Sequence, residues 1–140
     1  MANLREQVDM PHRTARTAAA AGLAESPPDI ATMRAVVDRL LDPDAAPEGL
    51  PPAPGEIETL TLQLRGHLEL LRPEVEETAQ KLPRASIPRY CALACTGEAR
   101  ERLRTAPSPR FGGPVGHARR LARTLNALVD HWETLRGDPS

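Results

Sequence analysis

The clearest pattern of apolar and polar positions lies near the C-terminal end of the chain, between residues 113 and 135. Apolar side chains recur there at spacings of three and four residues, the pattern of a helix that buries one face in a bundle. Pro114 suits a first helical turn, and Gly137 and Pro139 follow the last one. The pattern predicts a helix over 114–136 with a buried stripe formed by Ala118, Leu121, Leu125, Leu128, Trp132 and Leu135.

Two earlier segments show the same periodicity. Residues 29–41 form a short apolar stripe behind Asp29, a good N-cap residue. Residues 55–82 form a longer helix, in which Leu62 and Leu70 widen the main stripe and predict contact with two neighbouring helices. Pro73 lies inside this segment, where it removes a backbone hydrogen bond and predicts a kink, or alternatively a break into two helices.

A further helix is predicted over 86–105, with Ser86 as its N-cap. Its middle, from Ala92 to Gly97, consists of small side chains apart from Leu93. Such a stretch lets another helix approach closely or leaves room for a ligand. The sequence therefore predicts an all-α protein, a four-helix up-and-down bundle over 29–137, with a flexible N-terminal arm over 1–28, a proline-rich connector over 42–54 and a short tail over 138–140.

Composition narrows the setting of this bundle. The chain has 140 residues and 15 prolines, and its aromatic residues are Tyr90, Phe111 and Trp132, so the core must be aliphatic and modest in size. No run of eighteen apolar residues and no apolar N-terminal block is present, which predicts a cytoplasmic protein without membrane association. The two cysteines do not form a disulfide framework and are expected to be reduced thiols.

Charge is divided unevenly along the chain. Residues 25–80 carry twelve acids and four bases, whereas residues 81–123 carry ten bases and two acids. The two halves are expected to neutralise each other across helix interfaces. Arg119, Arg120 and Arg123 share the outer side of the last helix and are the candidates for binding an anionic partner, including nucleic acid. No helix-turn-helix spacing or interleaved aromatic residues support a nucleic-acid site.

Cys91 and Cys95 lie one helical turn apart and are the candidates for chemistry. With His67 or His117 they could complete a metal site, or one thiol could be reactive, but small buried side chains in a helix contact are the preferred interpretation. Tyr90 is expected in the core, where its hydroxyl needs a partner. The sequence thus predicts no metal, cofactor or catalytic residue, and places any ligand pocket around His67, Tyr90, Cys91, Ala94 and Cys95.

Three segments of the chain are similar to a known family. SIPRYCALACTGEARERL, PGEIETLTLQLRGHLELL and GGPVGHARRLARTLNALVDHW resemble small actinobacterial proteins of unknown function that are often labelled natural product biosynthesis protein. The resemblance covers roughly residues 30–135 and whole helices. It implies a setting in specialised metabolism and assigns no site residue.

These observations predict a non-catalytic helical interaction or accessory protein that binds a protein partner or associates with itself. One alternative is a small-molecule-binding protein or cofactor-free enzyme with its pocket near Tyr90 and Cys91. Another is a nucleic-acid-associated regulator that uses the basic C-terminal half. A co-purifying small molecule would favour the first alternative, and a steep salt dependence of DNA binding the second.

Overall fold

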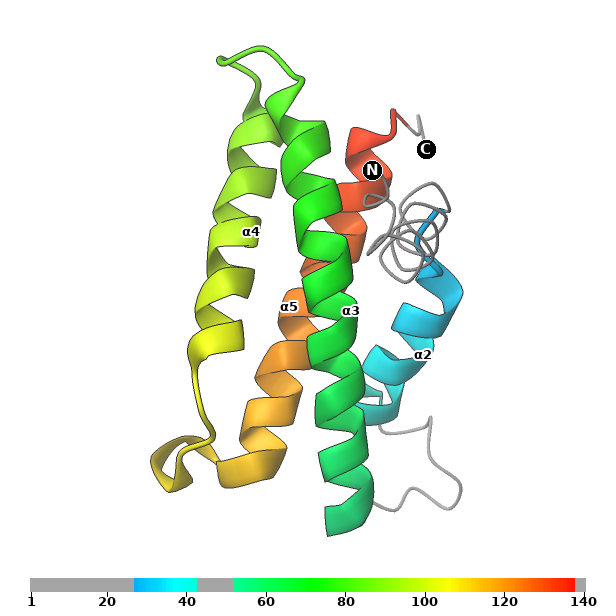
Figure 1. The fold of residues 1–140 in the computed structure, drawn as a ribbon, viewed down its shortest axis with the longest axis vertical. Helices are drawn as coiled ribbons and strands as arrows, with labels where there is room; N and C mark the ends of the chain where they lie inside the picture. Colours follow the sequence, from blue (N-terminus) through cyan, green and yellow to red (C-terminus); the bar gives the residue numbers. More distant parts are fainter. Residues whose placement is uncertain (1–26, 43–51, 138–140) are drawn as a thin grey trace, which may run out of the picture.

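The computed structural model describes residues 27–42 and 52–137, which form α-helices and a short 3-10 turn (Figure 1). The helices are α2 (Ile30–Leu41), α3 (Pro54–Gln80), α4 (Ile87–Arg104) and α5 (Gly113–Leu135), and the turn is η2 (Pro109–Phe111). The predicted all-α, four-helix class is confirmed, and the expected helix ranges differ from these by one or two residues. Residues 1–26 of the predicted arm, residues 43–51 of the connector and the tail over 138–140 lie outside the described residues.

Local sequence sets the ends of these helices. The Asp29 side chain accepts a hydrogen bond from the Thr32 backbone N–H at 3.1 Å, and the Ser86 side chain accepts one from the Arg89 N–H at 3.2 Å. Both residues satisfy a donor that a helix start leaves unpaired, as their sequence positions predict. The other two long helices begin with a proline in the first turn, where no backbone donor is needed.

Pro73 lies within α3, which continues unbroken from residue 54 to residue 80. The alternative of two separate helices is therefore wrong. Pro73 is exposed, so its ring and the carbonyl that it leaves without a donor face away from the core. The apolar residues on both sides of it, Leu71 and Val75, are fully buried and hold the two halves of the helix on one packing surface.

The four helices form a flattened bundle in which α3 and α5 make the most extensive contact (Figure 1). In the figure α4 flanks this pair on one side and α2 on the other, and no contact joins α2 to α4 within the described ranges. In a square up-and-down bundle, α3 and α5 would be diagonal partners. Here α3 and α5 are in direct contact instead, which brings their N-terminal ends close together.

The core is aliphatic and centred on α3 and α5, whose stripes include Leu64, Leu68, Leu71, Leu121, Leu125 and Leu128, all fully buried. Trp132 is 8% exposed and completes the α5 stripe as predicted. Leu62 and Leu70 do not widen the buried stripe of α3. They are 67% and 52% exposed, so the predicted widening was wrong, although α3 does pack against both α4 and α5.

Polar contacts hold α2, a short helix, against this core. Arg34 of α2 reaches across to α5, where its guanidinium donates to the Asn126 amide oxygen at 2.5 Å and pairs with Asp130 and Glu133 at 3.0 Å. The two carboxylates raise the pKa of Arg34 even though burial acts to lower it. This network sets the position of α2 along α5, against which the α2 stripe packs.

Candidate functional site

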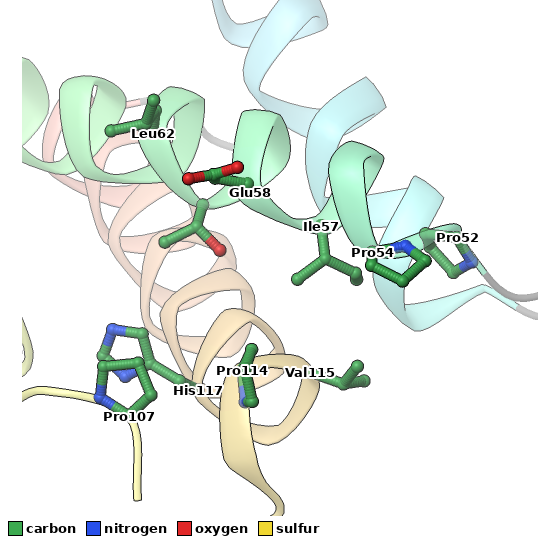
Figure 2. Close-up of a pocket in the computed structure, with 10 residues that line it drawn as sticks. Pro52, Pro54, Ile57, Glu58, Leu62, Pro107, Pro114, Val115 and His117 are labelled. Carbon is green, nitrogen blue, oxygen red and sulfur yellow. The ribbon is translucent and has the colours of Figure 1, made fainter.

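An open groove of about 540 Å³ lies at one end of the bundle, where the first turns of α3 and α5 meet the segment that follows α4. We call it the terminal groove. Figure 2 shows its α3 residues on one side and its α5 residues on the other. Apolar side chains dominate its lining, which consists of Pro52, Pro54, Ile57, Glu58, Thr61, Leu62, Pro107, Pro114, Val115 and His117.

The sequence builds this groove from helix ends. Pro54 and Pro114 lie in the first turns of their helices, and Pro107 comes three residues after the end of α4, so each ring lies near a helix end. Proline there places an apolar ring at a helix terminus, where backbone groups would otherwise need solvent. The result is an apolar surface at the bundle end, a place where polar termini are usual.

A tight turn holds the α5 side of the groove in position. Gly112 and Gly113 have φ values of +90° and +60°, a region that favours glycine, and they direct the chain from η2 into α5. A Cβ atom at Gly116 would collide with the carbonyl oxygen of Phe111. The same oxygen accepts a hydrogen bond from Arg120 at 2.8 Å, so the turn and the first two turns of α5 form one packed unit.

His117 is the buried polar side chain of the groove, at 2% exposure. Burial lowers its pKa, and the nearby charges of Arg120, Arg65 and Arg102 lower it further. Its imidazole is therefore neutral at pH 7, with one nitrogen that donates and one that accepts. Within the described part of the chain neither nitrogen makes a hydrogen bond, and neither is among the fully buried polar atoms, so solvent or an occupant can reach both.

Chemically, this arrangement suits binding. The lining offers seven apolar side chains, one neutral imidazole, one hydroxyl and the exposed carboxylate of Glu58. Volumes of this size and this apolar character are typical of ligand and peptide sites. Thr61 supplies the hydroxyl and His117 the imidazole, and no hydrogen bond joins the two side chains in the described structure.

The residues predicted around a ligand pocket lie elsewhere. Tyr90 is 75% exposed, so the expectation that it lies in the core was wrong, and Cys91 and Ala94 are on the outer side of α4, where Cys91 is exposed. Cys95, one helical turn further along, is buried. Core packing is thus confirmed for Cys95 and wrong for Cys91, and none of the four lines the terminal groove.

Burial raises the pKa of Cys95 to about 11, and Glu98 and Asp130 contribute in the same direction. Its thiol stays protonated at neutral pH and is not an activated nucleophile. His67 is half-buried on α3, where burial lowers its pKa and the charge of Asp29 partly opposes the shift. Over the described residues no group of three or more His, Cys, Asp or Glu side chains is placed to hold a metal ion.

The three predicted arginines do lie near one another on α5. Arg119 and Arg123 are exposed, and Arg120 is half-buried against η2, with its guanidinium 5.8 Å from the centre of the Phe111 ring. None of the three has an ion pair in the described ranges. Expected neutralisation between the acidic and basic halves is limited there to one pair, Arg100 with Glu76 at 2.8 Å.

Sequence reasoning missed most of the terminal groove. The sequence singles out His117 only as a possible metal-binding partner of the cysteines, and it indicates Pro114 only as a residue of a first helical turn. One available signal was the grouping of Pro107 and Pro114 around a helix start that carries a histidine on the apolar stripe one turn later. That signal does not reveal the third side, which Pro52 and Ile57 supply from about fifty residues away.

The fold and this groove define a small all-α bundle with an apolar groove at its end. The chain belongs to a protein family described as a family of unknown function (DUF6415), which matches residues 31–137. No curated protein and no solved structure matches the chain significantly. No helix in the described ranges has the length and apolar content needed to cross a membrane.

Proposed function

We propose that this protein is a non-catalytic interaction protein whose terminal groove receives an apolar segment of a partner protein. One observation carries the proposal: the groove is open, and its apolar lining continues onto side chains that water reaches. Leu62 and Val115 line the groove and are 67% and 37% exposed. Exposed apolar side chains grouped at one place are typical of protein interaction sites.

The shape of this surface favours a protein segment over a small molecule. A small-molecule site encloses most of its ligand, whereas this groove is open, and Leu62 in its lining is 67% exposed. A partner that presents two or three apolar side chains could cover the groove and its exposed apolar residues together. Several contacts of that kind form the centre of a typical interface.

His117 supplies the polar selectivity of the site. The imidazole makes no hydrogen bond within the described structure and its nitrogens are not sealed from solvent, so an occupant that offers a carbonyl or hydroxyl group can bond to them where a purely apolar one cannot. A peptide backbone offers both a donor and an acceptor at every residue other than proline. This matches the two nitrogens of a neutral imidazole and supports a peptide as the occupant.

The biological setting is part of the proposal. The resemblance of three helical segments to actinobacterial natural product biosynthesis proteins supports an accessory role in specialised metabolism, in the cytoplasm. The partner would be another protein of that setting or a second copy of this chain. Nothing in the groove requires a cofactor for such a role.

The test compares surfaces on one protein. Tagged wild-type protein, the double variant Leu62→Glu with Val115→Glu, and the control Ile87→Glu are each purified from the host. Ile87 and Tyr90 are 74% and 75% exposed on α4 and lie outside the groove, so the control carries Tyr90→Glu as well, which matches the two introduced charges at distant apolar positions. Proteins recovered with the wild type are then produced separately, and their binding to all three variants is measured by calorimetry.

We expect a purified partner that binds wild type and the control equally and binds the double variant at least about tenfold more weakly, as for the loss of buried apolar contacts. Equal binding to all three proteins would place the partner on another surface and refute the proposal. Recovery of a small molecule that the double variant loses would refute it in favour of a ligand-binding protein. Mass spectrometry under native conditions separates these two results.

A further inference from the structure

A second hollow lies between the C-terminal half of α4 and the middle of α5, and its lining is strongly basic. It encloses about 370 Å³ and is lined by Glu98, Arg102, Arg120, Arg123, Thr124 and Ala127. We call it the arginine cleft. Three guanidinium groups and one carboxylate give its lining a net charge of +2. None of these residues lines the terminal groove, so a ligand of this cleft is independent of the function proposed for the groove.

The positive charges of this cleft are poorly compensated from within. Arg102 has one ion pair, with Glu98 at 3.4 Å, and its Nε is buried without an acceptor in the described structure. Arg120 donates to a neutral carbonyl, that of Phe111. Arg123 has no ion pair within the described residues. Neighbouring like charges repel, so an anion that entered the cleft would relieve this repulsion.

Helix packing fixes where these charges are. Arg120 and Arg123 are three residues apart and so lie on the same side of α5. Arg102 comes from the last turn of α4, which packs against α5. The Thr124 hydroxyl donates to the Arg120 carbonyl at 3.0 Å and is not a charged competitor in the cleft. A site whose charges are held by two packed helices loses little entropy when an anion binds.

We propose that the arginine cleft binds a phosphate dianion, either inorganic phosphate or the phosphate group of a small phosphate monoester. Such a group carries a charge of about −1.5 to −2 at neutral pH, which balances the net charge of the cleft. Its oxygens accept the paired hydrogen bonds that guanidinium groups donate. A carboxylate would leave about one positive charge uncompensated.

The dimensions distinguish this ligand from a nucleic acid. A nucleic-acid backbone carries one charge per phosphate and needs a row of cations along its length. Here the cations converge on one cleft, and Glu98 lies among them. The volume admits one phosphate group with part of an attached molecule, which is what a monoester requires.

The test titrates inorganic phosphate into the full-length protein at low ionic strength and measures binding by calorimetry. Arg123→Gln should bind phosphate about tenfold more weakly, the usual effect of one charge-assisted hydrogen bond. Glu98→Gln removes the internal competitor and should bind phosphate about threefold more tightly. Both residues are exposed, so the variants should fold, and circular dichroism melts verify this.

Arg119→Gln is the matched control. Arg119 is an exposed arginine one turn before Arg123 on α5 but does not line the cleft, so its loss should change phosphate affinity by less than about twofold. A simple sugar phosphate serves as the second probe. Tighter binding of the sugar phosphate identifies a monoester as the ligand, and equal binding identifies free phosphate. Either result supports the site.

Three results would overturn the proposal. One is the absence of phosphate binding at millimolar concentration by the wild type and by Glu98→Gln. Another is an equal loss of affinity in Arg119→Gln and Arg123→Gln, which would show attraction by overall charge alone. The last is tight binding of a random DNA duplex that phosphate does not displace, which would assign the arginines to nucleic acid instead.

Discussion

Replacing Trp132 by alanine tests how much of the stability of this small bundle depends on one side chain. Trp132 is 8% exposed at the C-terminal end of the α5 stripe, and the Arg136 guanidinium lies 5.2 Å from its ring centre. A buried aromatic side chain removes about 150–250 Å² from water, worth roughly 4–6 kcal/mol at about 25 cal/mol per Å². The contact with Arg136 adds about 0.5–1 kcal/mol.

The alanine keeps part of that surface, and the neighbours relax into part of the space. We therefore expect Trp132→Ala to lower the free energy of unfolding by about 4 kcal/mol, within the range of about 3–5 kcal/mol found for such truncations. The total free energy of unfolding of a native protein is about 5–15 kcal/mol, so the variant should be near the limit of folding. Urea denaturation followed by circular dichroism measures the change, since the variant has no tryptophan fluorescence.

Tyr90→Ala is the matched control, because it truncates an aromatic side chain that is 75% exposed. Its effect should stay within about 0.5 kcal/mol, as for an ordinary surface position. The reasoning fails if Trp132→Ala costs less than about 1 kcal/mol, or if the two variants lose similar amounts of stability. In either case the burial of the side chain would not determine how much unfolding free energy its truncation costs.

The cysteines, Gly116 and His117 give three further predictions. In the native protein a thiol reagent should modify Cys91, which is exposed, and should reach Cys95 only on unfolding, because Cys95 is buried and its pKa is raised to about 11; equal rates would contradict this. Gly116→Ala should destabilise the fold by about 1–3 kcal/mol through a backbone collision, whereas Gly55→Ala, where the added atom meets nothing within 4 Å, should not, as paired thermal melts can show. Because the pKa of His117 is lowered in the folded state from an ordinary value of 6.5, the folded protein binds fewer protons than the unfolded chain below that pH, so its stability is complete above about pH 6.5 and falls as the pH drops. His117→Gln should show a smaller fall in stability between about pH 7 and pH 5 than the wild type, and an identical pH dependence in urea titrations would refute the shift.

Helix positions could be predicted from the sequence because they depend on local features. The α5 stripe from Leu121 to Trp132, the caps at Asp29 and Ser86, and the prolines at helix starts all act within one or two turns. Each of these features indicates a helix or a helix end independently of the rest of the chain. The four helix ranges could therefore be predicted to within one or two residues, and the fold class could be predicted from them.

The choice of buried face on α4 could not be predicted in the same way. One side carries Ile87, Tyr90, Cys91 and Ala94, and another carries Ala92, Cys95, Thr96 and Ala99, both at helical spacing. Hydrophobicity alone favours the side with the larger residues. The structure buries the smaller ones, because a helix that packs close to two neighbours needs small side chains at the contact. Only the positions of α3 and α5 decide this.

The terminal groove was beyond local reasoning for a similar cause. Its lining comes from three separated parts of the sequence, and it exists because α3 and α5 meet along their lengths. The expected pairing of acidic and basic halves is largely absent because most ion pairs form locally. Apart from those of Arg34 and Arg100, the ion pairs in the described ranges form within one half of the chain, such as Arg72 with Glu76 and Arg104 with Glu101. The two pairs named lie one helical turn apart and need no contact between halves.

The position of α2 and α4 on opposite sides of the α3–α5 pair has a consequence for how mutations combine. Energies of substitutions add when the residues share no contact and become non-additive when they do. A change at Val37 of α2 and one at Ala99 of α4 should therefore be additive, although both residues are buried in the same small protein. Changes at Leu125 of α5 should be coupled to those at other core positions, since its helix contacts both flanking helices. The two flanking helices are thus free to vary in sequence independently of each other, while α5 must remain compatible with both.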